Sequence, residues 1–249
     1  MKNTSFSLRS LHGFTLMESL LAIALVGVLL SIFLTVFVPS RGLVRQALTR
    51  QESERITGIL RAEMSTLRDD EIAKGKNSSD KEYLSTFDKG FYWLQKSKRP
   101  SSAIVIFSYR ADMSKKPRAD GSYPAIPAGK SVPGKNSQLV SIACPMDDPL
   151  HRNEISAAVG PVFVVKMTQL ERTGNKGEYR LARMPGVING ASTPESYVSR
   201  PGEKVAWGGA VFFRADFYLM SPPNPARYRG KTWAKLGRPL FSANLSFHR

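Results

Sequence analysis

Cysteine is almost absent from this chain. Cys144 is the single cysteine, so no intramolecular disulfide can form, even in an oxidising compartment. We expect Cys144 to be a small core residue at the end of an apolar strand. An intermolecular disulfide is the alternative.

The common signatures of catalysis and metal binding are also lacking. The sequence contains no HExxH motif, no GxSxG motif and no paired-cysteine metal spacing. The three histidines are far apart, at His12, His151 and His248. We therefore expect a protein that is not an enzyme and that uses no cofactor.

Three acidic residues lie near one another in the sequence, at Asp147, Asp148 and Glu154. Their oxygen atoms are of the kind that calcium prefers. Adjacent aspartates in a loop are more often simply solvated, and we expect no metal site here.

Acidic residues are scarce relative to basic ones. The chain has 36 Lys and Arg against 20 Asp and Glu, a net charge of +16. Residues 81–249 carry 26 of the basic and 12 of the acidic residues, whereas residues 1–80 are nearly balanced at 10 and 8. Most of the net positive charge therefore lies in the part of the chain that we expect to be globular.

The excess of positive charge is strongest in residues 221–249, which hold six basic residues and no acidic one. Tyr228, Trp233 and Phe241 are interleaved with Arg227, Arg229, Lys231, Lys235 and Arg238. Such a mixture is typical of sites that bind nucleic acid or an acidic polysaccharide, because cations meet the anions while aromatic rings stack on bases. A solvated loop beside a core tryptophan is the other interpretation, and it is the one we favour.

One long apolar run is present near the amino terminus. Residues 20–38 contain no charge, and Ser31 and Thr35 are their only polar members. About 20 apolar residues at about 1.5 Å each can cross a bilayer core of about 30 Å. Glu18 lies at the edge of this run, where a carboxylate is costly unless it is paired. Immediately before the run the chain reads Gly13-Phe14-Thr15-Leu16-Met17-Glu18.

A short polar leader, this motif and an apolar helix together resemble the amino terminus of type IV pilins and type II secretion pseudopilins, over roughly the first 55 residues. The resemblance implies that a prepilin peptidase cuts after Gly13 and methylates the new amino terminus at Phe14. It also implies that Glu18 serves assembly, by pairing with the methylated amine of a neighbouring subunit. An uncleaved signal anchor or a secretory signal peptide is the alternative. The carboxy-terminal disulfide of several pilins is not possible here.

Charges around the apolar run do not fix its orientation. Lys2, Arg9 and His12 precede it, and Arg41, Arg45 and Arg50 follow it, so the positive-inside count is nearly balanced. The family resemblance implies a single-pass protein of the inner membrane. Its carboxy-terminal domain would then be periplasmic, or extracellular in a filament.

Apolar spacing after the run predicts that the helix continues, nearly unbroken despite Pro39 and Gly42, from about residue 14 to residue 67. Its polar side would carry Glu52, Glu54, Arg55, Arg61, Glu63 and Arg68 in solvent. A charged loop follows at 69–80, then a short helix or irregular segment at 83–95. Strands are predicted at 103–109, 139–144, 162–170, 178–184, 210–220 and 240–247.

These patterns predict an α+β fold in which a long amino-terminal helix packs on an antiparallel sheet. The expected parts are a leader (1–13), a transmembrane and assembly helix (14–38), its amphipathic continuation with a loop (39–80), and a β-rich globular domain (81–249). In the strand at 210–220, we expect Val211, Phe213, Ala215, Phe217 and Leu219 to face the core. The segment at 112–137 should be a long exposed loop.

The combined expectation is a non-catalytic structural subunit, a minor pilin or pseudopilin, of a type IV pilus-like or type II secretion filament. Its partners would be prepilin peptidase, other pilin or pseudopilin subunits and the inner membrane. A pilin-like adhesin that binds nucleic acid or acidic polysaccharide, and a membrane-anchored protein of another class, are the alternatives.

Overall fold

The computed structural model describes residues 16–68, 83–118, 120–127, 136–149, 151–173, 178–189, 191–197 and 209–249. It divides the chain into two compact units, one ending at Glu52 and the other beginning at Ser53. We describe each unit by itself.

One helix, α1 (Leu16–Met64), begins in the first unit and ends in the second. Its 49 residues are helical in an unbroken run, including Pro39 and Gly42, so the predicted continuous helix is confirmed. The window Leu16–Phe33 has a mean hydropathy of 2.4 and none of it is buried. By length and composition it can cross a membrane, as an anchor or as a signal sequence. Within it, the Ser31 hydroxyl donates a hydrogen bond to the Gly27 carbonyl at 2.9 Å, which satisfies its polar group locally.

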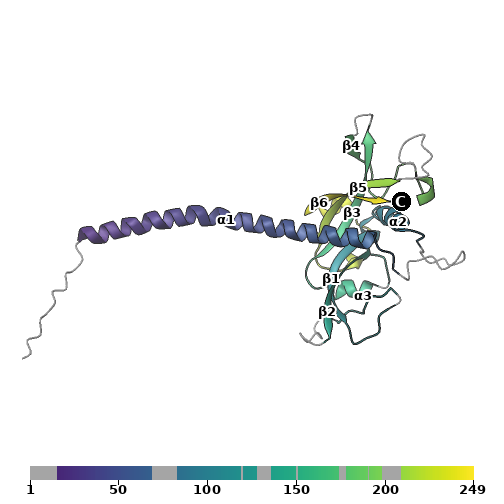
Figure 1. The fold of residues 1–249 in the computed structure, drawn as a ribbon, viewed down its shortest axis with the longest axis horizontal. Coiled ribbons are helices and arrows are strands. Elements are labelled where there is room, and N and C mark those ends of the chain that lie inside the picture. The colour runs from purple at the N-terminus through teal and green to yellow at the C-terminus, as the bar shows by residue number, and fades with distance from the viewer. Residues whose placement is uncertain are drawn as a thin grey trace, which may run out of the picture. The chain divides into compact units, whose positions relative to one another are not determined.

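The second unit is built on an antiparallel sheet in the order β2-β1-β3-β5-β6, with β4 paired to the far end of β3 (Figure 1). The strands are β1 (Ile104–Asp112), β2 (Ser137–Pro145), β3 (Val162–Thr173), β4 (Glu178–Leu181), β5 (Ala210–Met220) and β6 (Phe241–His248). The helices are α2 (Thr86–Lys96) and α3 (Arg152–Ser156), with 3₁₀ turns η1 (Pro100–Ser102), η2 (Pro194–Ser196), η3 (Pro225–Tyr228) and η4 (Trp233–Leu236). The predicted α+β class and all six predicted strands are confirmed.

One face of the sheet is covered by helices. From α1, Ile56, Leu60 and Met64 are buried at helical spacing, as the amphipathic pattern predicted. Helix α2 adds Phe87, Phe91 and Leu94 to the same core. Ser85 begins α2 as its N-cap, because its side chain accepts a hydrogen bond from the Asp88 amide at 3.2 Å.

The opposite face of the sheet is also buried, and the sequence did not predict this. Val105, Phe107 and Val164 form a second core with Ile155 of α3 and Tyr228 of η3. Helix α3 and turn η3 therefore cover the second face of the sheet, which would be open to solvent if only one face carried a core.

The second core overturns part of the prediction for β5. Val211, Phe213, Ala215 and Phe217 are buried as expected. Leu219 is 51% exposed, whereas Tyr218 and Met220, expected on the outer face, are buried. Near the carboxy-terminal end of β5 the second core covers the face on which Met220 lies, whereas the opposite face is open at Leu219.

Two other expectations also need correction. Glu63 and Arg68 were expected in solvent, but their side chains are only 14% and 22% exposed, since they contact each other and neighbouring charged groups. In the segment at 112–137, Asp120 and Ser122 are each 7% exposed, so part of that loop folds inward. The hairpin of β3 and β4 is confirmed, although its turn at 174–177 lies outside the described residues.

Candidate functional site

The two predicted processing residues, Gly13 and Phe14, lie outside the described residues. Glu18 is described, and it is the acidic residue in the first turn of α1. Its side chain is exposed and stands directly before the apolar segment. A carboxylate at a helix amino terminus gains about 0.3–1 kcal/mol from the helix dipole. That gain is far smaller than the cost of placing an ionised carboxylate in hydrocarbon, so the position favours a site with a cationic partner.

The five predicted polyanion-binding residues are all exposed, namely Arg227, Arg229, Lys231, Lys235 and Arg238. They surround two aromatic side chains that hold the segment onto the domain. Trp233 donates a hydrogen bond from Nε1 to the Ser97 carbonyl at 2.7 Å, and its ring lies 5.5 Å from that of Tyr218. Lys231 Nζ lies 5.2 Å from the centre of the Tyr228 ring. The expected tryptophan is therefore partly buried and anchoring, while the cations point outward.

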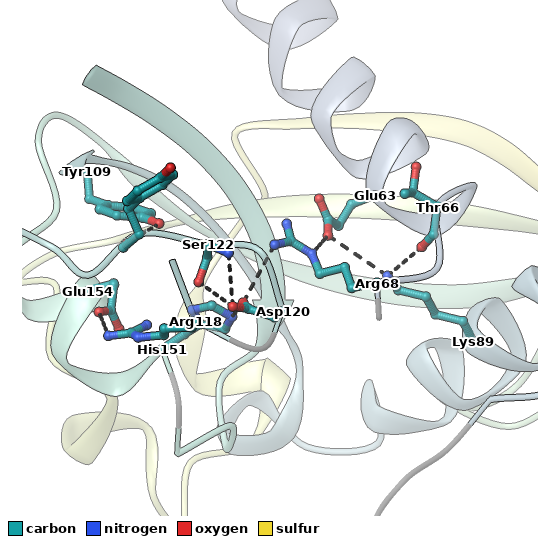
Figure 2. A network of polar contacts seen from close by, with 11 residues as sticks. Glu63, Thr66, Arg68, Lys89, Tyr109, Arg118, Asp120, Ser122, His151 and Glu154 are labelled. Atoms are coloured by element: carbon teal, nitrogen blue, oxygen red, sulfur yellow. Dashed lines mark hydrogen bonds and ion pairs between the residues drawn. The ribbon is translucent and has the colours of Figure 1, made fainter. Parts of the chain in front are cut away.

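Sequence reasoning missed a network of charged side chains inside the domain, drawn in Figure 2. Lys89 of α2 is fully buried, and its Nζ donates a hydrogen bond to the Thr66 carbonyl at 2.8 Å. The same nitrogen lies 3.9 Å from Glu63 Oε1, which also accepts from Arg68 Nε at 2.7 Å. These contacts join the end of α1 to α2.

Asp120 continues the network toward the second core. Its Oδ1 accepts from the Ser122 amide at 3.0 Å and from the Ser122 hydroxyl at 2.7 Å. Its Oδ2 lies 3.5 Å from His151 Nε2 and 3.6 Å from Arg68 Nη1. Burial raises the pKa of Asp120, but the Ser122 hydrogen bonds, together with electrostatic contributions from His151 and Arg68, outweigh burial, and the net pKa is lowered.

A second buried carboxylate, Glu154, lies on α3. Its Oε1 accepts from Arg118 Nη2 at 2.5 Å, and its side chain is 1% exposed. Tyr109 lies near both buried carboxylates and donates its hydroxyl to the Tyr123 carbonyl at 3.0 Å. Burial, and then the charges of Glu154 and Asp120, raise the pKa of the Tyr109 phenol. The phenol therefore stays protonated at neutral pH and acts as a donor.

The space inside this network is small. A cavity of about 40 Å³ is lined by Asp120, His151, Trp93 and Cys144 among others. That is room for about one water molecule and not for an organic substrate. We interpret the network as structural, since it ties α1, α2, α3 and the loop after β1 together.

The three acidic residues considered for calcium are not placed to hold a metal ion together. Asp147 pairs with Lys96 at 2.5 Å, and Glu154 is buried against Arg118 rather than solvated. In the part of the chain that the structure describes, no group of three or more His, Cys, Asp or Glu side chains is placed to hold a metal ion.

Cys144 lies in β2 with 3% of its surface exposed, so the prediction of a small core residue is confirmed. Burial raises the pKa of its thiol well above the ordinary value. The alternative of an intermolecular disulfide would require this part of the sheet to open.

One sequence signal pointed to part of the network. Asp120-Gly121-Ser122 has the composition of a turn in which an aspartate bonds the backbone two residues on, and Gly121 has the positive φ (76°) that such turns favour. Its burial against His151 and Arg68 depends on tertiary packing and carries no local pattern.

Comparison of the chain with protein-family models, with curated proteins and with solved structures gave no match.

Proposed function

We propose that this protein is a non-catalytic structural subunit of a pilin-like filament, of the type IV pilus or type II secretion kind. The observation that carries the proposal is the pairing of two features in one helix. Leu16–Phe33 is apolar and exposed, with Glu18 at its start, whereas Ile56 and Leu60 of the same helix are built into the domain core. A helix of this kind needs lipid or other helices around its first part.

The proposed mechanism is assembly. Prepilin peptidase cuts after Gly13 and methylates the amine of Phe14, and the helix then leaves the inner membrane to pack beside those of neighbouring subunits. Packing removes the apolar surface of Leu16–Phe33 from both lipid and water. The folded domain stays periplasmic or extracellular.

The processing step has a direct test. Mass spectrometry of protein from cells with an active peptidase should show an amino terminus at methylated Phe14. Gly13→Leu should leave the chain uncut, because the peptidase has to approach an extended backbone closely at this position. Gly27→Ala is the matched control, since a Cβ at Gly27 meets nothing within 4 Å, and it should be cut normally. An intact Met1 terminus on the unmodified chain would refute the proposal.

The assembly step depends on Glu18. We propose that its carboxylate pairs with the new amine of Phe14, on its own chain or an adjacent one, because an ionised carboxylate beside an apolar segment needs a cation. Glu18→Ala and Glu18→Gln should both be cleaved and fold, yet be depleted from the assembled complex. Glu54→Gln, an exposed acidic position further along α1, serves as the control. Recovery of both Glu18 variants in the complex at wild-type levels would contradict this role.

A second candidate function is polyanion binding by the basic carboxy-terminal segment. It is favoured by the five exposed cations, Arg227, Arg229, Lys231, Lys235 and Arg238, on a segment anchored to the fold by Trp233. Affinity for a polyanion should then fall steeply with salt, because bound phosphates release counterions. Replacing Arg227, Arg229 and Lys231 by Ala should flatten that slope. An unchanged slope would assign the positive charge to solubility alone.

A further inference from the structure

A groove of about 600 Å³ lies beside the carboxy-terminal end of α2. Its wall includes Tyr83, Tyr92 and Gln95, with Lys98 and Arg99 from the turn that follows the helix. The rings of Tyr83 and Tyr92 are stacked, with centres 6.0 Å apart and planes inclined by 27°. Tyr83 is buried, whereas Tyr92 is 39% exposed, so the outer ring of the pair is the one open to a ligand. The groove is within the usual size range of ligand sites, about 300–1,000 Å³.

Positive charge dominates the groove. Lys96 is neutralised by Asp147 at 2.5 Å, but Lys98 and Arg99 are exposed and have no acidic partner among the described residues. The helix dipole favours cations at this end of α2, which accounts for Lys96 in the last turn. The same dipole disfavours an anion bound directly to the helix end. A negatively charged ligand would therefore be held by the side chains of Lys98 and Arg99.

The fold places the basic carboxy-terminal segment next to this groove. Trp233 bonds to the carbonyl of Ser97, the residue between the groove's Lys96 and Lys98, across 136 positions of sequence. The turns η1 and η3 also pack together, which brings the chain after Arg99 beside Arg227. The segment that carries Lys98 and Arg99 is thus in contact with the basic carboxy-terminal segment, and the same two residues line the groove.

We propose that the groove and the basic carboxy-terminal segment form one binding site for single-stranded nucleic acid. A base stacks on the open face of Tyr92. Gln95 Nε2 donates one hydrogen to the Ser192 carbonyl at 3.0 Å, which leaves its second amide hydrogen and its Oε1 for the edge of the base. Lys98 and Arg99 contact the adjoining phosphates, and the cations of 227–238 continue those contacts along the strand. Duplex is disfavoured because its bases are already stacked and paired, which leaves none for the tyrosine.

This inference rests on the second candidate function, polyanion binding. It adds the class of ligand, single-stranded nucleic acid, and the residue that stacks on its bases, Tyr92. It does not depend on assembly into a filament. The experiment must therefore separate a site that stacks bases from a surface that attracts any polyanion.

The full chain in non-ionic detergent is titrated into a fluorescein-labelled 12-nucleotide oligo-dT, and binding is followed by anisotropy at several salt concentrations. Tyr92→Leu should weaken binding about tenfold or more, the usual loss for one stacked base. Tyr92→Phe keeps the ring and should bind like the unmodified chain. Tyr179→Leu changes an exposed tyrosine of β4 and is the matched aromatic control.

Charge is tested in the same assay. Arg99→Gln should weaken binding and lower the slope of log affinity against log salt by about one phosphate contact. Lys116→Gln removes an exposed cation of the loop after β1 and should leave that slope unchanged. Circular dichroism spectra that match the unmodified chain ensure that Tyr92→Leu and Arg99→Gln are folded.

Four results would overturn the proposal. One is equal binding by Tyr92→Leu and the unmodified chain with the salt slope retained, which would refute the groove and leave polyanion binding standing. Another is competition by inorganic polyphosphate or polygalacturonate as strong as that by oligo-dT at equal charge, or tighter binding of a duplex of the same length. Absence of any salt-dependent binding would refute the groove and the second candidate function together, while the filament proposal would stand.

Discussion

Gly90 offers the sharpest test of how the helices pack on the sheet. It lies in the interior of α2, where alanine normally stabilises a helix by about 1 kcal/mol relative to glycine. A Cβ at this position would stand 2.7 Å from Cγ of Phe247 and 2.9 and 3.1 Å from its two Cδ atoms. Helix propensity alone predicts that Gly90→Ala raises the free energy of unfolding, whereas the contact with Phe247 predicts that it lowers it. The short distances to Phe247 indicate that the effect of packing is the larger.

The magnitude follows from how firmly Phe247 is held. This residue of β6 is 6% exposed, and its ring lies 5.4 Å from that of Phe87 and 5.9 Å from that of Phe213. Because the contacted atoms are at the base of the ring, relief requires the ring or the helix to shift. Overpacking of this kind costs about 1–3 kcal/mol. After the gain in propensity, Gly90→Ala should lower the free energy of unfolding by up to about 2 kcal/mol.

Gly58→Ala provides the matched control. Gly58 is also inside a helix, α1, but a Cβ there meets nothing within 4 Å. It should raise the free energy of unfolding by up to about 1 kcal/mol, so the difference between the two variants isolates the clash at about 1–3 kcal/mol.

The assay is urea unfolding of the full chain in non-ionic detergent, followed by tryptophan fluorescence. Adding Phe247→Leu to Gly90→Ala should cost less than the sum of the two single changes, because the leucine leaves room for the new methyl group. A Gly90→Ala variant as stable as Gly58→Ala would refute the packing of α2 on β6 described above.

Two further predictions concern buried titratable groups. Burial raises the pKa of Asp216, but hydrogen bonds from Ser242, Lys166 and Arg214 outweigh burial, and the net pKa is lowered. The stabilising effect of the ionised Asp216 is therefore complete above about pH 4, and it is lost as the pH falls through the pKa of the folded state. Asp216→Asn should flatten the acid-side decline of the free energy of unfolding, and an unchanged decline would contradict this. Cys144, with its raised thiol pKa, should react with Ellman's reagent only at the rate of unfolding; fast reaction of the folded chain would place it at the surface.

Local pattern was enough to predict most of the secondary structure. Ile56, Leu60 and Met64 are spaced for a helix with one apolar side, and all three are buried in one core. The β-branched and aromatic run at the start of β1 and the hairpin of β3 and β4 were likewise readable. In each case the residues that decide the structure are close together in sequence.

The covering of the second face of the sheet was not readable in this way. Met220 is buried in a core that also contains Tyr228, and the ring of the buried Tyr218 lies 5.5 Å from that of Trp233. Tyr228 and Trp233 belong to a segment that reads as polar, basic and rich in proline. The exposed cations of the carboxy-terminal segment could be listed from sequence, but the contact of that segment with the chain after α2 depends on the bond of Trp233 to Ser97. No local pattern encodes a contact between residues so far apart.

Lys89 shows most clearly why the burial of a charged residue could not be predicted from the sequence. Lys89 reads as an ordinary polar position of α2, yet it is fully buried, because the chain just after α1 offers it the Thr66 carbonyl and Glu63 of α1 supplies a carboxylate. A chain that leaves a helix inside a domain carries backbone carbonyl groups that need partners there, and a buried lysine is one way to satisfy one of them. The burial of Lys89 is therefore a consequence of where α1 ends.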